Sequence, residues 1–182
     1  MPLILRPPRP DDEAALRAMH EQVLADGFEI LLVNGTWEEI LETLRKQAAG
    51  VDLPPEWVRS DFLVAEVGGV VVGRVSIRHE LNEQLLEVNG HVGYAVAPGH
   101  RRRGYATEIL RQSVARLAAL GVDRVLVTCD EDNAGSAAVI EANGGVLEDI
   151  RPVGQRRIRR YWIGTGAQDS PPQASSPAHP SD

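Results

Sequence analysis

The chain has a single cysteine and a single lysine among its 182 residues. Cys129 alone excludes an internal disulfide and suits a reducing compartment. Lys46 lies far from any glycine-rich turn, which excludes a Walker A phosphate loop with its Gly-Lys-Ser/Thr ending. The other eighteen basic side chains are arginines. The five histidines are scattered, without HxH or HxxxH spacing, so we predict no metal site.

Positive charge and long apolar runs are also scarce. Nineteen basic residues against 26 acidic ones give a net charge of −7, which argues against nucleic acid or an anionic membrane as a partner. The chain has neither 18 consecutive apolar residues nor a signal-peptide pattern at its start, so we expect a cytoplasmic location. A hydrophobic content of 43% is ordinary for one globular domain of this length.

The hydrophobic periodicity predicts an α/β fold in which strands and helices follow the order β-α-α-β-β-β-α-β-α-β-β. The expected strands are 3–5, 62–67, 70–77, 90–96, 125–129, 146–150 and 157–163. The expected helices are 11–25, 36–49, 107–120 and 134–143. Thr36 and Glu39 predict a capping box at the start of the second helix, and Gly68-Gly69 predicts a two-residue hairpin between strands 62–67 and 70–77. We expect a mixed central sheet of about seven strands with helices on both faces. Residues 1–163 form the domain, and 164–182, rich in Gly, Ser, Pro, Ala and Gln, form a disordered tail.

The most informative segment joins the strand ending at Val96 to the helix that starts near Thr107. It reads VAPGHRRRGYAT, so three arginines and Gly104 precede the helix. A helix N-terminus has unpaired N–H groups and positive potential, and small residues keep side chains away. This arrangement suits a pyrophosphate. The glycine spacing does not fit a dinucleotide-binding Rossmann turn.

A second pattern follows, in which the strand VLVTCD ends at a polar cluster and Asn133 is placed to cap a short helix. Gly144 then lies where a helix end requires a positive φ. Together, Arg-x-x-Gly-x-Ala and Asn133-x-x-Ser136 resemble the GNAT superfamily of N-acetyltransferases. The runs RHELN, GHVGY and CDEDN resemble one bacterial branch of it. The resemblance covers about residues 60–163, and the element order also fits.

The resemblance implies acetyl-CoA as the co-substrate, with no metal. The pantetheine arm would lie between strands 90–96 and 125–129, paired with main-chain groups of the first strand. The implied cofactor-binding residues are Tyr94, Ala95, Val96, Arg101, Arg102, Arg103, Gly104, Tyr105, Ala106, Thr107, Asn133 and Ser136.

The implied reaction is direct attack of a neutral amine on the acetyl thioester, which needs a base, an oxyanion donor and an acid. Many family members place a tyrosine seven residues after the asparagine, where its phenol protonates the thiolate. This chain has Ile140 there, so Tyr94, Tyr105 and Cys129 are candidate substitutes. The thiolate could also leave unassisted.

For the general base we predict His91 first, then Glu80 and His79, because His91 opens the strand beside the thioester and imidazole titrates near neutrality. The alternative is that His91 only hydrogen-bonds a neighbouring segment. The run Arg78-His79-Glu80 at a strand end could bind a substrate carboxylate, position an amine or be an ordinary solvated strand end. Cys129 is a poor nucleophile, because Asp130 and Glu131 would raise its pKa.

We therefore expect an N-acetyltransferase acting on a primary amine. Two alternatives stay open: an acyl-CoA-binding sensor that has lost catalysis, which the isoleucine at position 140 keeps possible, and an acetyltransferase for protein amines. A homodimer through the last strand, Arg157 to Ile163, is also possible.

Overall fold

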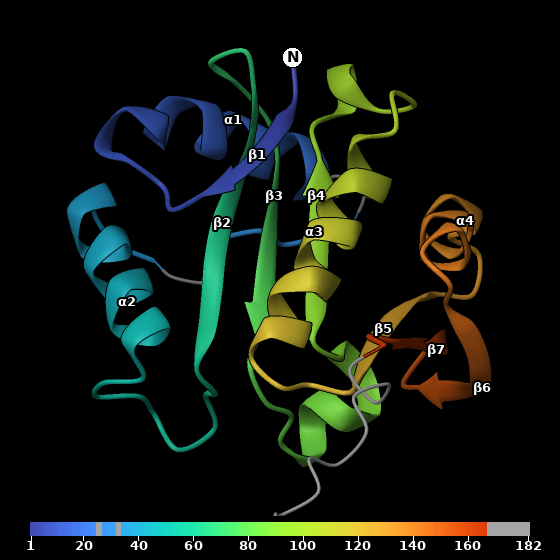
Figure 1. Cartoon of the computed structure of the whole chain (residues 1–182). Coiled ribbons are helices and arrows are strands. Elements are labelled where there is room, and N and C mark those ends of the chain that lie inside the picture. Colours follow the sequence, from blue (N-terminus) through green and yellow to red (C-terminus); the bar gives the residue numbers. More distant parts are fainter. Residues whose placement is uncertain (25–26, 32–33, 167–182) are drawn as a thin grey trace, which may run out of the picture.

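The computed structural model describes residues 1–24, 27–31 and 34–166, and its elements follow the predicted order (Figure 1). The strands are β1 (Leu3–Arg6), β2 (Ser60–Val67), β3 (Val70–Arg78), β4 (Val92–Val96), β5 (Arg124–Asp130), β6 (Val146–Val153) and β7 (Arg156–Gly164). The helices are α1 (Glu13–Leu24), α2 (Trp37–Ala49), α3 (Tyr105–Ala119) and α4 (Ala134–Ala142). Short turns of 3-10 or π-helix are η1 (Pro10–Asp12), η2 (Leu85–Asn89) and η3 (Pro98–His100). Residue 25, the expected end of α1, lies outside the described residues. None of the helices in the described part is long and apolar enough to cross a membrane.

The seven strands form two sheets, which corrects the expectation of one mixed sheet. The orders are β1-β2-β3-β4 and β5-β7-β6, and every named pair is antiparallel. Between the sheets, the one isolated bridge in the described residues joins Gly90 to Val127. Gly90 has φ +64°, so the chain turns there before β4 begins. Beyond this bridge β4 and β5 do not pair.

Two turn signals in the sequence are confirmed because each is local. Thr36 and Glu39 form a capping box at the start of α2, with the Thr36 N–H donating to the Glu39 carboxylate at 2.8 Å. Gly68 and Gly69 both have positive φ and join β2 to β3 as a two-residue hairpin.

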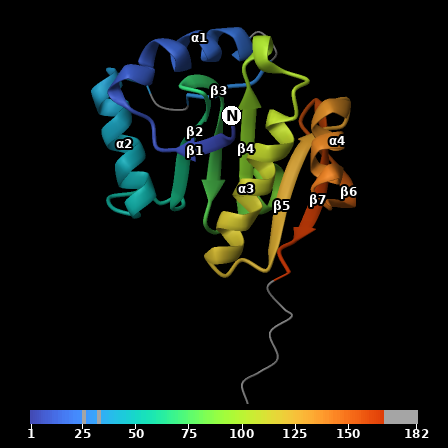
Figure 2. The ribbon, with the colours of Figure 1, turned by 45° about the horizontal axis from the view of Figure 1, so that its top comes forward.

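Helices cover both faces of the first sheet, as predicted, and bury two separate cores. Strand alternation divides the residues of β2, so that Phe62 and Val64 pack with α1 and α2 while Leu63 and Ala65 pack with α3. On β4, Ala95 faces α1 and α2, whereas Val92 and Val96 face α3. In Figure 2 the strands of the first sheet stand between α2 and α3, and α4 lies beside the second sheet.

The last strand lies in the middle of the second sheet, paired with β5 on one side and β6 on the other. Both edges of this strand are therefore already paired, so the strand offers no free edge for the predicted dimer through 157–163. The second sheet also continues past residue 163. Gly164 is the last residue of β7, and the Thr165 hydroxyl donates to the carbonyls of Val122 and Asp123 at 2.9 Å. Residues 167–182 of the expected tail lie outside the described residues.

Candidate active site

The arginine-rich turn lies at the upper end of β4, between η3 and α3 (Figure 1). Arg102 has φ +64° and Gly104 has φ +78°, so two left-handed residues bring the chain into α3. A Cβ placed on Gly104 would meet no heavy atom within 4 Å. The side of the turn next to Gly104 is therefore open space.

The main-chain donors of this turn are available. Within the described residues, no backbone hydrogen bond uses the N–H of Arg102, Arg103 or Gly104. The first helical bond runs from the Glu108 N–H to the Gly104 carbonyl at 3.1 Å, which leaves the amides of Tyr105, Ala106 and Thr107 without a helical partner. Their dipoles add to the positive end of a 15-residue helix.

The arginine side chains partly brace the turn. The Nε of Arg101 donates to the Val96 carbonyl at 3.3 Å, and the Nη2 of Arg103 donates to the Gly99 carbonyl at 3.4 Å. All three arginines of the run are exposed, so positive charge surrounds the open turn. The turn presents main-chain donors and positive charge together, which is the chemistry that holds a phosphate.

The lower end of the gap between β4 and β5 is closed by Gly90 and His91. The His91 N–H donates to the Leu126 carbonyl at 2.8 Å, and the Leu126 N–H donates to His91 Nδ1 at 2.9 Å. The imidazole thus takes the place of a strand carbonyl. A Cβ on Gly90 would lie 2.4 Å from the Leu126 carbonyl oxygen, so only glycine allows this approach.

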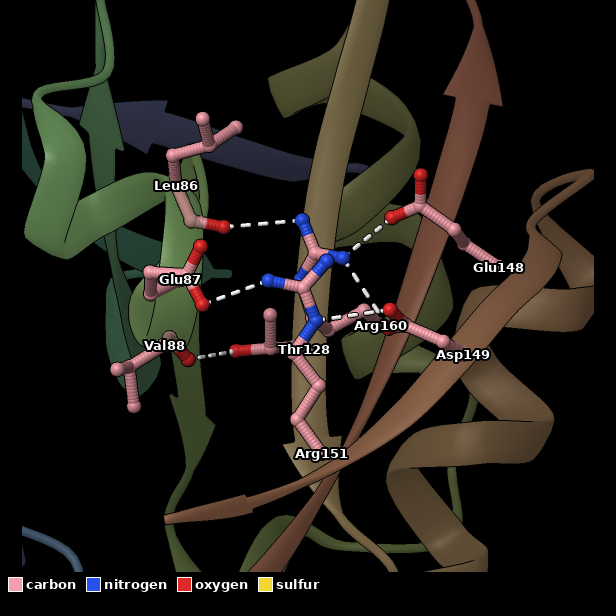
Figure 3. A network of polar contacts seen from close by, with 8 residues as sticks. All are labelled: Leu86, Glu87, Val88, Thr128, Glu148, Asp149, Arg151 and Arg160. Carbon is pink, nitrogen blue, oxygen red and sulfur yellow. Dashed lines mark hydrogen bonds and ion pairs between the residues drawn. The ribbon is translucent and has the colours of Figure 1, made fainter.

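A polar network holds the same end from the other side (Figure 3). Arg160 on β7 is only 2% exposed and donates to the Leu86 carbonyl at 3.0 Å and to Asp149 at 3.1 Å, with a further contact to Glu148. Arg151 forms two ion pairs, with Glu87 at 2.6 Å and with Asp149 at 2.8 Å.

The Thr128 hydroxyl of β5 completes the network by donating to the Val88 carbonyl at 2.7 Å. The network therefore ties the segment before β4 to all three strands of the second sheet. It lies at the closed end of the gap.

His91 is a poor candidate for the general base that the sequence suggested. It is 6% exposed, and burial, helped by the nearby charge of Arg78, lowers its pKa to about 4. The ring is therefore neutral at physiological pH, with Nδ1 occupied by the Leu126 N–H. A neutral imidazole that accepts at Nδ1 carries its proton on Nε2 and has no lone pair left. The alternative interpretation, a hydrogen bond to a neighbouring segment, describes its observed contact.

Tyr94 reaches from β4 to the first turn of α4. Its hydroxyl lies 2.9 Å from the Ser136 hydroxyl, and burial raises the pKa of the phenol to about 12. Ser136 is positioned by the predicted cap, because its N–H donates to Asn133 Oδ1 at 2.9 Å. Two protonated hydroxyls therefore meet beside the gap between β4 and β5.

Ile140 is completely buried in the core shared with α3, one helical turn after Ser136. The two side chains lie on the same side of α4, since residues four apart stack on one helical face. The hydroxyl group that position 140 lacks is present one turn earlier.

Cys129 is buried at the same place, and burial raises the pKa of its thiol, which hydrogen bonding from Ser136 only partly offsets. A thiol held protonated is a weak nucleophile. This agrees with the sequence argument against an acetyl-cysteine intermediate.

The other two predicted bases, His79 and Glu80, directly follow β3, whose last residue pairs with His91. His79 Nε2 is 3.1 Å from Asp61 Oδ2, and the His79 N–H donates to the Arg59 carbonyl. Glu80 is exposed just beyond β3. The structure does not bring either side chain to the open turn, and their catalytic role stays a prediction.

Arg78 belongs to the run RHELN noted in the sequence, whereas Arg74 and Arg160 were not predicted. Arg74 and Arg78 lie on one face of β3 together with Ser76, at every second position. That alternation was a visible signal for a polar stripe. The burial of Arg160 had no such signal, because its partners come from segments far apart in the chain.

Comparison with known families agrees with the resemblance noted above. The family model described as "Acetyltransferase (GNAT) domain" matches residues 2–146. The chain therefore belongs to the GNAT acetyltransferase family, and the prediction of family, fold and acyltransferase class is confirmed. None of the curated proteins searched matches it.

Solved structures of low sequence identity share the fold. Mycobacterium smegmatis RimJ in complex with CoA-disulfide has a TM-score of 0.72 and 22% identity, covering 92% of this chain and 84% of that one. The Salmonella typhimurium protein yncA with its cofactor acetyl-CoA has a TM-score of 0.66 and 17% identity, covering 95% and 99%. The spermidine N-acetyltransferase SpeG chimera from Vibrio cholerae and hSSAT has a TM-score of 0.62 and 15% identity, covering 90% and 95%.

Proposed function

We propose that the protein is an acetyl-CoA-dependent N-acetyltransferase that moves an acetyl group to a primary amine by direct attack on the thioester. The observation that carries the proposal is the open turn at Gly104, with its free amides at the start of α3, directly above a gap between β4 and β5. The family membership and the acetyl-CoA and CoA bound in the yncA and RimJ structures support it.

The residues of the turn fit a pyrophosphate. The amides from Arg102 to Thr107 would bind its oxygens, and the exposed arginines would balance its charge. The main chain of Tyr94, Ala95 and Val96 would accept the pantetheine amides as an added strand. When bound, acetyl-CoA supplies the activated acetyl thioester.

Tyr94 and Ser136 are the acid in this proposal. The raised pKa keeps the phenol protonated at neutral pH, and a thiol such as that of CoA has a pKa near 8.5. In the acid role the phenol donates a hydrogen bond to the departing thiolate while the Ser136 hydroxyl supports the phenol oxygen, and the proton that the attacking amine releases converts the thiolate to the thiol. This pair takes over the task for which Ile140 is unsuited.

The test measures thiol release from acetyl-CoA across a panel of amino acids, polyamines, aminoglycosides and short peptides. Tyr94→Phe removes only the phenol oxygen, and we expect kcat to fall about 10- to 100-fold. Ser136→Ala should lower kcat by less, because Tyr94 stays in place. Tyr161→Phe, which removes a phenol oxygen that donates to Glu141 outside the proposed site, is the matched control.

Amine-dependent release that falls in Tyr94→Phe and not in Tyr161→Phe would support both the activity and the acid. Release that is equal in all variants would keep the activity and remove Tyr94 from the acid role. Acetyl-CoA binding in calorimetry without release from any amine would replace the enzyme with the acyl-CoA sensor.

A further inference from the structure

Two arginines of β3 have no acidic partner. Within the part of the chain that the structure describes, neither Arg74 nor Arg78 forms an ion pair. Arg74 is 3% exposed and donates only to neutral oxygens: Ser76 Oγ at 3.0 Å and the carbonyls of Gly93 at 3.0 Å and Glu29 at 3.3 Å. Its Nε is buried without a partner.

Two other deeply placed arginines, Arg6 and Arg160, do pair with carboxylates. Arg6 joins Asp12 and Glu66, each at 2.6 Å, and Arg160 joins Glu148 and Asp149. A buried guanidinium normally needs a carboxylate, because an unpaired charge in the interior is costly. The lack of one beside Arg74 and Arg78 therefore calls for an explanation.

Both guanidinium groups converge on Gly93 of β4, from opposite directions. Arg74 Nη1 donates to the Gly93 carbonyl, and Arg78 Nη1 lies 3.9 Å from where a Gly93 Cβ would be. In the part of the chain that the structure describes, and apart from the neighbours Val92 and Tyr94, no other heavy atom comes within 4 Å of that Cβ position. The space above Gly93 is thus open and bordered by positive charge, on the sheet face that carries α1 and α2.

Arg78 has donors that a ligand can reach. Its one side-chain hydrogen bond in the described residues runs from Nη1 to the Gly90 carbonyl at 3.1 Å. Its Nε and Nη2 are not among the buried unpartnered atoms, so solvent reaches them. Arg74 lies deeper, with its guanidinium between the rings of Phe28 and Phe62 at about 5.5 and 5.4 Å. Burial lowers the pKa of both arginines, that of Arg74 to about 9, which reflects the missing negative charge.

We infer that Arg78, with the charge of Arg74 behind it, forms a carboxylate-binding subsite above Gly93, and that the acceptor amine carries a carboxylate. The second half of this inference rests on the proposed acetyltransferase activity, and the first half does not. Nε and Nη2 of one guanidinium match the two oxygens of a carboxylate side by side. A phosphate would leave its third oxygen without a donor from Arg78. Gly93 belongs to the same strand as Tyr94, which places the subsite on the opposite face from the proposed acid.

The binding test uses the NMR signals of the arginine Nε–H groups in the full chain. The probes are N-acetyl amino acids with small, aliphatic and aromatic side chains, each compared with its uncharged amide. We expect the Arg78 signal to shift with the acids and not with the amides. Arg78→Gln, which can still donate to the Gly90 carbonyl, should weaken binding of the acids about 10- to 100-fold, as expected for one charge-assisted pair.

Gly93→Ala is a second variant that keeps both charges. The added methyl lies at ordinary contact distance from Arg78, so the variant should fold while the filled space weakens acid binding. Arg59→Gln is the matched control, because Arg59 is exposed and its side chain, among the described residues, donates to the Ala48 carbonyl alone. Equal shifts with acids and amides, or acid binding unchanged in both Arg78→Gln and Gly93→Ala, would overturn the subsite.

Turnover separates this inference from the proposed function. Carboxylated amines that are acetylated at least tenfold more efficiently than their amides, with the preference lost in Arg78→Gln, support both halves. Equal turnover of acids and amides overturns the acceptor class and leaves the acetyltransferase standing. An acid-specific Arg78 shift without thiol release from any amine supports the subsite and overturns the enzyme.

Discussion

Replacing His91 by asparagine should change how stability depends on pH while leaving catalysis largely intact. The asparagine oxygen can accept from the Leu126 N–H in place of Nδ1, and an amide does not titrate. The variant therefore preserves the contact that closes the gap and removes the ionisable ring. We expect kcat to change by less than about tenfold, whereas loss of a general base costs about 10²- to 10⁴-fold.

The magnitude follows from the pKa of the ring. Burial lowers it from 6.5 to about 4, so between these pH values the unfolded chain binds a proton at His91 and the folded chain does not. Folding stability therefore falls as the pH drops from about 6.5 to about 4. The difference between the two pKa values corresponds to about 3 kcal/mol in the free energy of unfolding. The wild type should lose this stability as the pH falls, and His91→Asn should not.

Urea unfolding at a series of pH values measures this difference, and the pH–rate profile of thiol release measures the catalytic part. His91→Ala serves as the comparison, because it leaves the buried Leu126 N–H without a partner and should cost about 1–3 kcal/mol at pH 7. A His91→Asn variant whose kcat falls 100-fold while its stability follows the wild-type pH curve would refute the structural role.

Three further substitutions test other parts of the site. Gly104→Asp should weaken CoA binding at least tenfold in calorimetry relative to the neutral Gly104→Asn, because both fit a positive φ but only one repels a pyrophosphate. Gly90→Ala should lower the free energy of unfolding by at least about 2 kcal/mol in urea, while Gly99→Ala, which has open space, should not; equal values would contradict the close approach. Arg160→Met should cost about 2 kcal/mol in the same assay, compared with almost nothing for the exposed Arg45→Met, and no difference would show that the network adds nothing.

The parts of the fold that the sequence predicted are those decided by neighbouring residues. The capping box of Thr36 and Glu39 acts over three residues, as does the cap from Asn133 to Ser136. The glycine turn before α3 was predicted for the same reason, since Gly104 directly precedes the helix.

The parts that could not be predicted depend on residues far apart in the chain. The Nδ1 of His91 meets an amide 35 residues away, and Arg160 meets a carbonyl 74 residues away. Nothing in the local pattern of HVGYAV distinguishes a ring that faces the substrate from one that caps a strand. The one bridge between the two sheets in the described residues likewise joins Gly90 to Val127, which are far apart in the sequence.

The division into two sheets also has a consequence for motion. All three strands of the second sheet come from one continuous stretch, residues 124–164, which holds α4 as well. Such a stretch can open and close as one cooperative unit, hinged where Gly90 meets β5. A molecule bound between β4 and β5 would favour the closed form, so amide hydrogen exchange across residues 124–164 should slow together when CoA is added.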